Sequence, residues 1–240
     1  MNLKTLKSEL NSIYKYRIEL HAHTSPASSC SEVTPKELLD TFKNVDYDAM
    51  VITNHFQHQG EMMTKKEYLD FYMKDFYEAK AYGEEIGMKI ILGTEIRFTE
   101  NSNDYLIFGV NPEMLSEIYD LLPFGVDNFR KVYQMENSLF IQAHPFRDGI
   151  KKVDPKILDG IEAYNLHPHH NGRVGQAALY AKENNFKVIT AGTDFHHPTL
   201  GHEGLASLKA KFIPEDSFSL AELLKSNDYL YEAGRNNLIL

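Results

Sequence analysis

Short apolar segments that alternate with helix-like segments constrain the fold of this chain more than any other feature. Seven segments read as strands, at residues 16–21, 49–53, 89–93, 105–110, 139–143, 160–163 and 187–191. Helical periodicity or helix-capping signals separate most of them. Strands that alternate with helices are typical of a parallel β/α fold, and 240 residues suffice for one such domain. We therefore expect a single α/β domain over residues 1–240.

Helix boundaries are well marked at two places. Thr34 and Glu37 form a predicted capping box with Pro35 at the first helical position, and Thr64 and Glu67 form a second one. Further helices are expected at residues 65–86, 112–121, 126–137, 173–184 and 220–226.

Polar residues with metal-ligand chemistry follow the predicted strands. They lie within a few residues of five strand ends: His21 and His23, His55, Glu95, His144, and Asp194 with His196. The carboxyl ends of parallel strands converge on one face, where sites are built. The sequence therefore predicts that these side chains meet.

The residue types narrow the choice of metal. Five imidazoles and two carboxylates suit Zn²⁺, Mn²⁺ or Fe²⁺ better than Ca²⁺ or Mg²⁺, which favour oxygen ligands. Seven groups exceed one coordination shell, so two or three divalent metal ions are expected. A carboxylate can bridge two cations through its two oxygens, which makes Glu95 and Asp194 the candidate bridges.

The ordered set of motifs resembles the PHP family, named for its polymerase and histidinol-phosphatase members. The matching motifs are His21-Ala22-His23, Thr53-Asn54-His55, Gly93-Thr94-Glu95, Ala143-His144-Pro145 and Gly192-Thr193-Asp194-Phe195-His196. The resemblance implies a distorted seven-stranded (β/α)7 TIM-like barrel with a trinuclear metal site that hydrolyses phosphoesters.

The resemblance also implies a division of ligands. A first metal would be held by His21, His23, Glu95 and Asp194. A second would use Glu95, His144 and a residue after the sixth strand. A third would use His55, His196 and a residue from the loop after His23.

Three positions depart from the family pattern. Asn54 stands where the family usually has Asp, next to His55. After the sixth strand the usual histidine is replaced by Asn165, with His167 close by, and Asn165 is the favoured ligand. The loop at residues 24–31 contains serines and Cys30 but no His or Asp, so the third metal is expected to be weak, completed by water, or bound through sulfur.

Composition restricts the partners and the compartment. The net charge of −9 argues against a long duplex nucleic acid but not against a small phosphorylated substrate. No segment reads as a membrane span or a signal peptide, and the single cysteine fits a reducing compartment, so we expect a cytoplasmic protein. These features do not specify an oligomeric state.

The function expected from these residues is a metal-dependent phosphoesterase acting on a phosphomonoester, nucleotide or oligonucleotide with a metal-activated hydroxide. Asp194 or His196 could assist the leaving oxygen. Arg147 and Arg97 follow His144 and Glu95 closely enough to hold a phosphate, although Arg147 could equally form a surface salt bridge.

Two alternatives stay open. One is a metal-dependent amidohydrolase, which shares the His-x-His motif and a late Asp but often uses a bridging lysine where this chain has Glu95. The other is a non-catalytic metal-binding module, which would hold fewer than two metals tightly.

Overall fold

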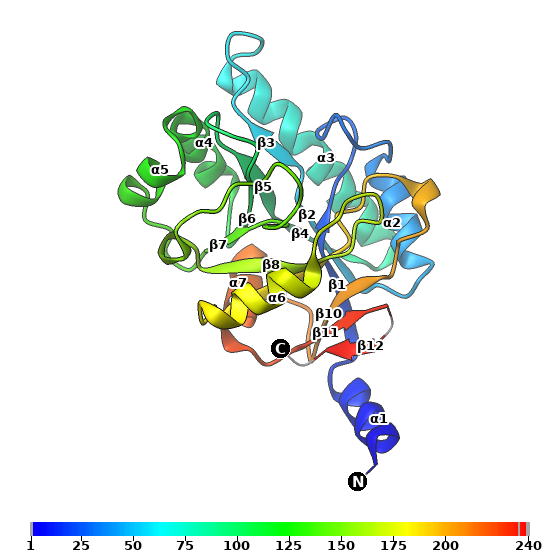
Figure 1. Cartoon of the computed structure of the whole chain (residues 1–240). Coiled ribbons are helices and arrows are strands. Elements are labelled where there is room, and N and C mark those ends of the chain that lie inside the picture. Colours follow the sequence, from blue (N-terminus) through cyan, green and yellow to red (C-terminus); the bar gives the residue numbers. More distant parts are fainter. Residues whose placement is uncertain (1, 235, 239–240) are drawn as a thin grey trace.

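Two six-stranded sheets form the centre of the computed structural model, which describes residues 2–234 and 236–238 (Figure 1). The expected domain at 1–240 thus includes residues 1, 235, 239 and 240, which lie outside the described part. The first sheet has the strand order β12 (Asn236–Leu238), β11 (Leu230–Ala233), β10 (Ala206–Ala210), β1 (Tyr16–Ala22), β2 (Ala49–Ile52) and β4 (Lys89–Leu92). The second has the order β3 (His55–Gln57), β5 (Thr94–Arg97), β6 (Asp104–Phe108), β7 (Leu139–Gln142), β8 (Gly160–Asn165) and β9 (Val188–Gly192).

The two sheets meet along two lines. At one, β2 and β4 are followed almost directly by β3 and β5, and the amides of Gly93 and Glu95 donate to the carbonyls of Ile52 (3.0 Å) and Asn54 (3.1 Å). At the other, which we call the β1/β9 seam, Ala22 and Phe195 form an isolated parallel bridge. Only a few backbone hydrogen bonds between described residues therefore join the sheets at this seam.

Strand direction was predicted correctly in part. The pairs β1–β2, β2–β4, β7–β8 and β8–β9 are parallel, as the alternation with helices indicated. However, β6 runs antiparallel to both β5 and β7, and β10 runs antiparallel to β1. The all-parallel expectation is wrong there because β6 follows β5 through a short turn with no intervening helix. The pairings among the described residues show mixed sheets and not a closed seven-stranded barrel.

Helices lie around the sheets (Figure 1). Their bounds are α1 (Leu3–Ile13), α2 (Pro35–Lys43), α3 (Lys65–Ile86), α4 (Pro112–Leu121), α5 (Val126–Val132), α6 (Val174–Glu183) and α7 (Ser217–Ser226), with short 3₁₀ turns at Leu122–Phe124, Pro155–Ile157 and Pro198–Leu200. Both predicted capping boxes form, at Thr34 and at Thr64. The helix expected at 126–137 ends at Val132. Among the described residues, no helix is long and apolar enough to cross a membrane.

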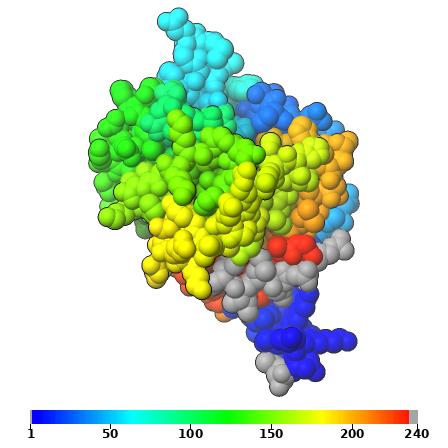
Figure 2. Space-filling model, viewed as in Figure 1, coloured from blue at the N-terminus to red at the C-terminus, as the bar shows by residue number. Residues whose placement is uncertain are grey.

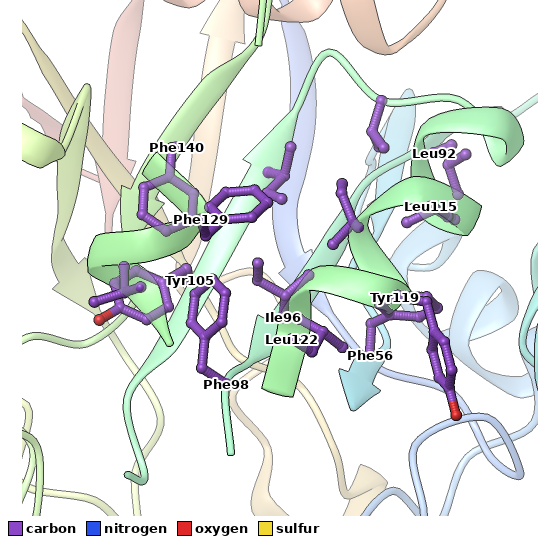
Figure 3. Packing of buried hydrophobic residues seen from close by; sticks show 14 of the residues in the cluster. Phe56, Leu92, Ile96, Phe98, Tyr105, Leu115, Tyr119, Leu122, Phe129 and Phe140 are labelled. Carbon is purple, nitrogen blue, oxygen red and sulfur yellow. The ribbon is translucent and has the colours of Figure 1, made fainter. Parts of the chain in front are cut away.

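An aromatic cluster fixes α4 and α5 against the second sheet (Figure 3). Phe129 of α5 and Tyr105 of β6 pack on Phe140 of β7, with ring centroids 5.6 and 4.7 Å from that of Phe140. All three side chains are buried. These contacts pack α5 against β6 and β7.

At opposite poles, the loop between β3 and α3 and helix α1 project from the surface (Figure 2).

Candidate metal centre

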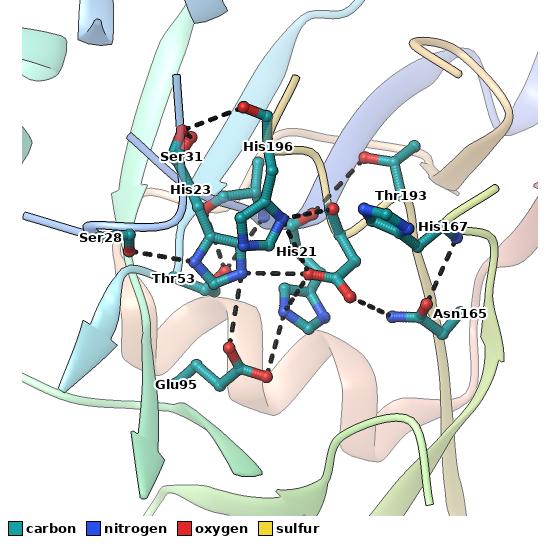
Figure 4. Close-up of polar contacts among 12 residues, drawn as sticks. His21, His23, Ser28, Ser31, Thr53, Glu95, Asn165, His167, Thr193 and His196 are labelled. Atoms are coloured by element: carbon teal, nitrogen blue, oxygen red, sulfur yellow. Dashed lines mark hydrogen bonds and ion pairs between the residues drawn. The ribbon is translucent and has the colours of Figure 1, made fainter. Parts of the chain in front are cut away.

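Side chains from several strand ends meet between the two sheets (Figure 4). The structure brings together all seven groups that the sequence singled out: His21 in β1, His23 just after it, His55 in β3, Glu95 in β5, His144 after β7, and Asp194 and His196 after β9. Six of the seven residues are buried, and the side chain of His55 is 16% exposed. We call this set the seven-residue cluster.

Glu95 lies at the centre of the cluster. Its Oε1 is 3.4 Å from Nε2 of His21 and 3.1 Å from Nε2 of His144. Its Oε2 is 2.8 Å from Nδ1 of His55 and 3.5 Å from Nε2 of His23. One carboxylate thus faces four imidazoles, two on each oxygen, so each oxygen has ligand-type nitrogens beside it.

Asp194 closes the opposite side of the cluster. Its Oδ1 lies 3.3 Å from Nε2 of His23, 3.5 Å from Nε2 of His21 and 3.4 Å from Nδ1 of His196. Asp194 and His144 have φ angles of +52° and +29°, an unusual region for residues other than glycine. Such backbone conformations cost energy and cluster at functional sites.

The chemistry of these atoms fits a bound cation. Among the described residues, the buried atoms that make no hydrogen bond of good geometry include Nε2 of His21, Nε2 of His23, Nδ1 of His55 and Oε2 of Glu95. Leaving buried polar atoms unpaired is costly, and all four face the interior of the cluster. Three overlapping groups have ligand atoms within 4.8 Å of one another: His23, His55 and His196; His21, His23 and Glu95; His55, Glu95 and Asp104.

Electrostatics keep the carboxylates of the cluster ionised. Burial raises the pKa of Glu95 and of Asp194, but neighbouring imidazoles outweigh burial, so both pKa values lie well below the ordinary range. Burial lowers the pKa of His23 well below its ordinary value, and His196 and His55 lower it further. His23 is therefore a neutral imidazole, the form that binds metals.

Glu162 orients the cluster from behind. Its Oε1 lies 2.8 Å from Nδ1 of His21, and its Oε2 accepts from the amide of His144 (3.1 Å) and from Nδ2 of Asn165 (2.9 Å). A carboxylate on the far nitrogen of a ligating histidine fixes its tautomer and raises its basicity. Nε2 of His21 is thereby directed toward Glu95 and Asp194.

The comparison with known families agrees with this geometry. The sequence model of the PHP domain matches residues 19–225. The chain belongs to the PHP family. An uncharacterized protein from Methanocaldococcus jannaschii is similar to this PHP chain. The two are 24% identical over 155 residues, which cover 60% of this chain and 73% of that protein.

Solved structures share the fold of this PHP chain at low identity. A two-domain protein from Bacteroides vulgatus containing a predicted PHP-like metal-dependent phosphoesterase has a TM-score of 0.65 and 17% identity, covering 92% of this chain and 66% of that one. A lesion-specific endonuclease from Pyrococcus furiosus has a TM-score of 0.57 and 12% identity, covering 88% of this chain and 56% of that one. The PHP chain therefore spans less than two thirds of either protein.

Asn165 and His167 occupy different positions at the PHP site. Nδ2 of Asn165 donates to Asp194 (3.2 Å) and its Oδ1 accepts from Arg147 (3.1 Å), so its side chain lies against the cluster. His167 lies farther out, with its ring centroid 5.8 Å from that of His196. Its Nδ1 accepts from the amide of His169 (3.3 Å).

Both candidate arginines reach the same cavity of about 820 Å³, which is also lined by His55 and His196. Arg147 contacts the buried Asp194 carboxylate through Nη2, and its own side chain is 17% exposed. The surface salt bridge considered for Arg147 is therefore not what forms. Arg97 pairs through Nε and Nη2 with the two oxygens of Asp104, both at 2.7 Å.

Two acidic residues of the PHP site were missed by sequence reasoning. Asp104 lies at the beginning of β6, with Oδ2 3.8 Å from Nε2 of His144. Because β6 is antiparallel, its first residue lies beside the ends of its neighbours, and only the strand direction could have revealed this. Glu162 lies inside β8, where a carboxylate within an apolar strand was a usable signal.

The unusual Asn54 fastens the loop after β1. Its Oδ1 accepts from the amide of Thr24 (2.7 Å) and from Oγ of Ser28 (3.0 Å), while its Nδ2 donates to Oγ1 of Thr24 (2.8 Å). An aspartate could not donate this last bond. Asn54 therefore acts on the loop that covers the histidines and makes no contact of this kind with the cluster itself.

Proposed function

We propose that this PHP chain is a metal-dependent hydrolase of phosphoester bonds in small phosphorylated substrates. The observation that supports this most is the seven-residue cluster, whose unpaired buried atoms surround Glu95 at the edge of a cavity of about 820 Å³. A cavity of this size accommodates a nucleotide-sized molecule.

Two or three cations, Zn²⁺, Mn²⁺ or Fe²⁺, would be held by the metal residues predicted from the sequence. They are His21, His23, His55, Glu95, His144, Asn165, Asp194 and His196, to which the structure adds Asp104 as a candidate. When bound, such cations supply a water of lowered pKa and neutralise charge on phosphoryl oxygens.

Arg147 would orient the phosphate. Burial lowers its pKa, but Asp194 and Glu95 outweigh burial and raise it, so the guanidinium stays charged. Nη2 contacts Asp194 and Asn165, whereas the buried Nε has no hydrogen-bond partner among the described residues. Free donors on a guanidinium fixed by a carboxylate suit a tetrahedral oxyanion.

In a two-metal centre that leaves Nε2 of His196 without a cation, His196 would supply the proton for the leaving oxygen. Its Nδ1 lies 2.8 Å from the carbonyl oxygen of Asp194, which leaves Nε2 for the cavity. Burial lowers the pKa of His196, but Cys30 and Asp194 outweigh burial and raise it. A protonated imidazole beside the cavity is a suitable general acid.

The test compares three forms of the purified chain. Chelator-treated protein should not hydrolyse nucleotides, short oligonucleotides, sugar phosphates or amino-acid phosphates, and adding Mn²⁺, Zn²⁺ or Fe²⁺ should restore hydrolysis of at least one. Glu95→Gln should remove both activity and tightly bound metal. His58→Gln is the matched control, because His58 stacks on Tyr119 with centroids 4.9 Å apart and should leave both unchanged.

Two outcomes would count against the proposal. Protein with two or more bound cations that hydrolyses no phosphoester of the panel would exclude it. Fewer than two tightly bound cations per chain would favour the non-catalytic metal-binding module. The pairings of the described strands do not confirm the distorted (β/α)7 barrel, and the single domain at 1–240 and the cytoplasmic location stay predictions from the sequence.

A further inference from the structure

A second row of side chains lies outward from the cluster on strands β3 and β5. In this parallel pair His55 lies opposite Glu95. Two residues farther along, Gln57 lies opposite Arg97, and we call these two residues the outer row. Residues two apart on a strand point to the same face, so the outer row follows the cluster at about 7 Å along the strands.

The outer row lies toward the open side of the cavity. Side-chain exposure rises from 0% at Glu95 and 16% at His55 to 35% at Arg97. Gln57 and Arg97 both line the cavity of about 820 Å³ that His55 also lines. A substrate whose phosphoryl group binds at the cluster would therefore place the group esterified to it beside the outer row.

Hydrogen bonds hold the outer row in place. The backbone amide of Gln57 donates to the hydroxyl of Tyr68 in α3 (2.9 Å), which donates in turn to the carbonyl oxygen of His55 (3.3 Å). Nε and Nη2 of Arg97 each donate to Asp104 at 2.7 Å, which fixes the plane of the guanidinium. The side-chain amide of Gln57 makes no hydrogen bond to another described residue, so its donor and acceptor are available to a ligand.

Apolar side chains from α3 and the loop before it line the same cavity. Phe71 of α3 is half-buried, and Met63, just before the helix, is 38% exposed. The backbone amide of Gln59 donates to the hydroxyl of Tyr119 in α4 (3.1 Å), which anchors the beginning of this loop. An aromatic ring and a thioether make favourable contacts with flat rings, so this apolar wall suits an aromatic group.

We propose that the outer row and the apolar wall bind a nucleobase, so that the substrates of this site are nucleoside phosphoesters. Gln57 hydrogen-bonds to the edge of the base, because an amide presents a donor and an acceptor side by side as bases do. Phe71 and Met63 supply apolar contact, and the guanidinium of Arg97 offers a planar surface for stacking. This assignment rests on the proposed function, which places the phosphoryl group at the cluster.

Two other substrate classes match these groups less well. A sugar phosphate has no ring face to cover Phe71 and Met63. An aryl phosphate such as a phosphotyrosine side chain has the ring, but its edge carries no hydrogen-bonding groups for Gln57. A nucleobase satisfies both parts of the cavity.

Nucleosides without a phosphate test the base site independently of hydrolysis. With full-length protein and Zn²⁺, at least one of adenosine, cytidine and uridine should give stronger saturation-transfer NMR signals than ribose and phenol at the same concentration. Gln57→Leu should raise the Kd of that nucleoside by about 10-fold, because the hydrogen bonds of one side chain are lost. The matched control is Gln134→Leu, at an exposed glutamine outside the cavity, which should leave the Kd unchanged.

The variant Gln57→Glu separates recognition of the base from a merely structural role. A carboxylate accepts but does not donate, so it should favour cytidine, whose amino group donates, over uridine, whose O4 accepts. We expect the ratio of the uridine Kd to the cytidine Kd to rise by about 10-fold over that of the wild type. An unchanged ratio would show that Gln57 does not contact the base and would overturn the assignment.

Kinetics on substrates with the same leaving group give an independent measurement. The kcat/KM of nucleoside 5′-monophosphates should exceed that of ribose 5-phosphate by more than about 10-fold, as expected from stacking of one base. Equal values, or nucleosides that bind no better than ribose and phenol, would overturn the inference and leave phosphoester hydrolysis testable. Conversely, nucleosides that bind and respond to Gln57→Glu, without hydrolysis of any nucleotide, would contradict the proposed function alone.

Discussion

Arg147 connects two residues of the site. Its Nη2 contacts Asp194 and donates to Oδ1 of Asn165 at 3.1 Å. Lysine lacks the planar guanidinium, whose several N–H donors can bind a carboxylate, an amide and a phosphate at the same time. We expect Arg147→Lys to lower kcat/KM for phosphoester hydrolysis about 100-fold, which is typical of removing one donor to developing charge. Steady-state kinetics with metal analysis measure this.

The matched control for Arg147 is Arg173→Lys. Arg173 makes contacts with Asp148 and with the carbonyl oxygen of Phe146 (2.6 Å), outside the cluster. This variant should keep wild-type kcat/KM. Equal activity of Arg147→Lys and Arg173→Lys would show that Arg147 does not act on the substrate.

His202 makes the fold sensitive to acid. The residue is 1% exposed, and its ring stacks on Phe195 with centroids 4.7 Å apart. Burial lowers the pKa of His202 to about 4 from its ordinary value of 6.5, and His196 lowers it further while Asp194 opposes this. Between these two pH values the unfolded chain binds a proton that the folded chain does not, so stability falls as pH falls.

Between pH 6.5 and pH 4, we expect the free energy of unfolding to fall less in His202→Phe than in the wild type. The difference between the two decreases should be roughly 1–3 kcal/mol. Neither ring nitrogen has a hydrogen-bond partner of good geometry among the described residues, so an apolar ring sacrifices no such bond. Urea unfolding at several pH values measures the difference. The control is His169→Phe, at an exposed histidine, whose free energy of unfolding should change with pH as in the wild type. The same pH dependence in His202→Phe and the wild type would refute the prediction.

Residue identity at the site was largely readable from sequence. His21, Glu95 and Asp194 could be selected because each is a ligand-type residue near the end of an apolar strand. Asp104 and Glu162 could not be selected by that rule. Asp104 begins the antiparallel strand β6, and Glu162 lies within strand β8.

At the scale of elements, β9 approaches β1 closely enough to require glycine. A Cβ atom on Gly192 would lie 2.4 Å from Cβ of His21 and 2.8 Å from Oε1 of Glu162. Gly192→Ala should therefore displace His21 and cost about 1–3 kcal/mol of unfolding free energy, as overpacking does. It should also weaken metal binding although it removes no ligand.

Denaturant unfolding and metal titration test Gly192→Ala. Gly175→Ala is the matched control, since a Cβ there meets no atom within 4 Å and lies in helix α6. Alanine at that position should leave metal binding unchanged and stabilise the helix by up to about 1 kcal/mol. Wild-type metal affinity in Gly192→Ala would show that His21 is not displaced.

Elements were predicted better than their pairing. The capping boxes at Thr34 and Thr64 and the strand segments are local signals, and they form as expected. The reversal of β6 follows from its short connection to β5, whereas the antiparallel pairing of β10 with β1 joins segments far apart in the chain, which local patterns do not contain.

At the scale of the whole molecule, the cluster joins the two sheets. His21 belongs to β1 in the first sheet, whereas Glu95, His144 and Asp194 extend from strands of the second. Cations shared among them would link the sheets at the β1/β9 seam. Chelation should therefore lower the free energy of unfolding, and a cation at 100 times its Kd should restore about 2.7 kcal/mol per site.

Thermal unfolding with and without chelator measures this effect. Hydrogen exchange adds local information, because the amide of His23 donates to the carbonyl oxygen of Phe195 across the seam at 3.0 Å. Chelation should accelerate exchange of this amide more than that of Leu106, in the middle of β6. Equal acceleration at both positions would mean that cations stabilise the fold without holding the seam.

The sparse backbone bonding at the β1/β9 seam has a consequence for the life of the protein in a cell. Segments that open locally are the first that proteases cut. If cations hold the seam closed, the turnover of this chain will follow the cellular supply of metal, and starvation for metal will remove the inactive protein by degradation.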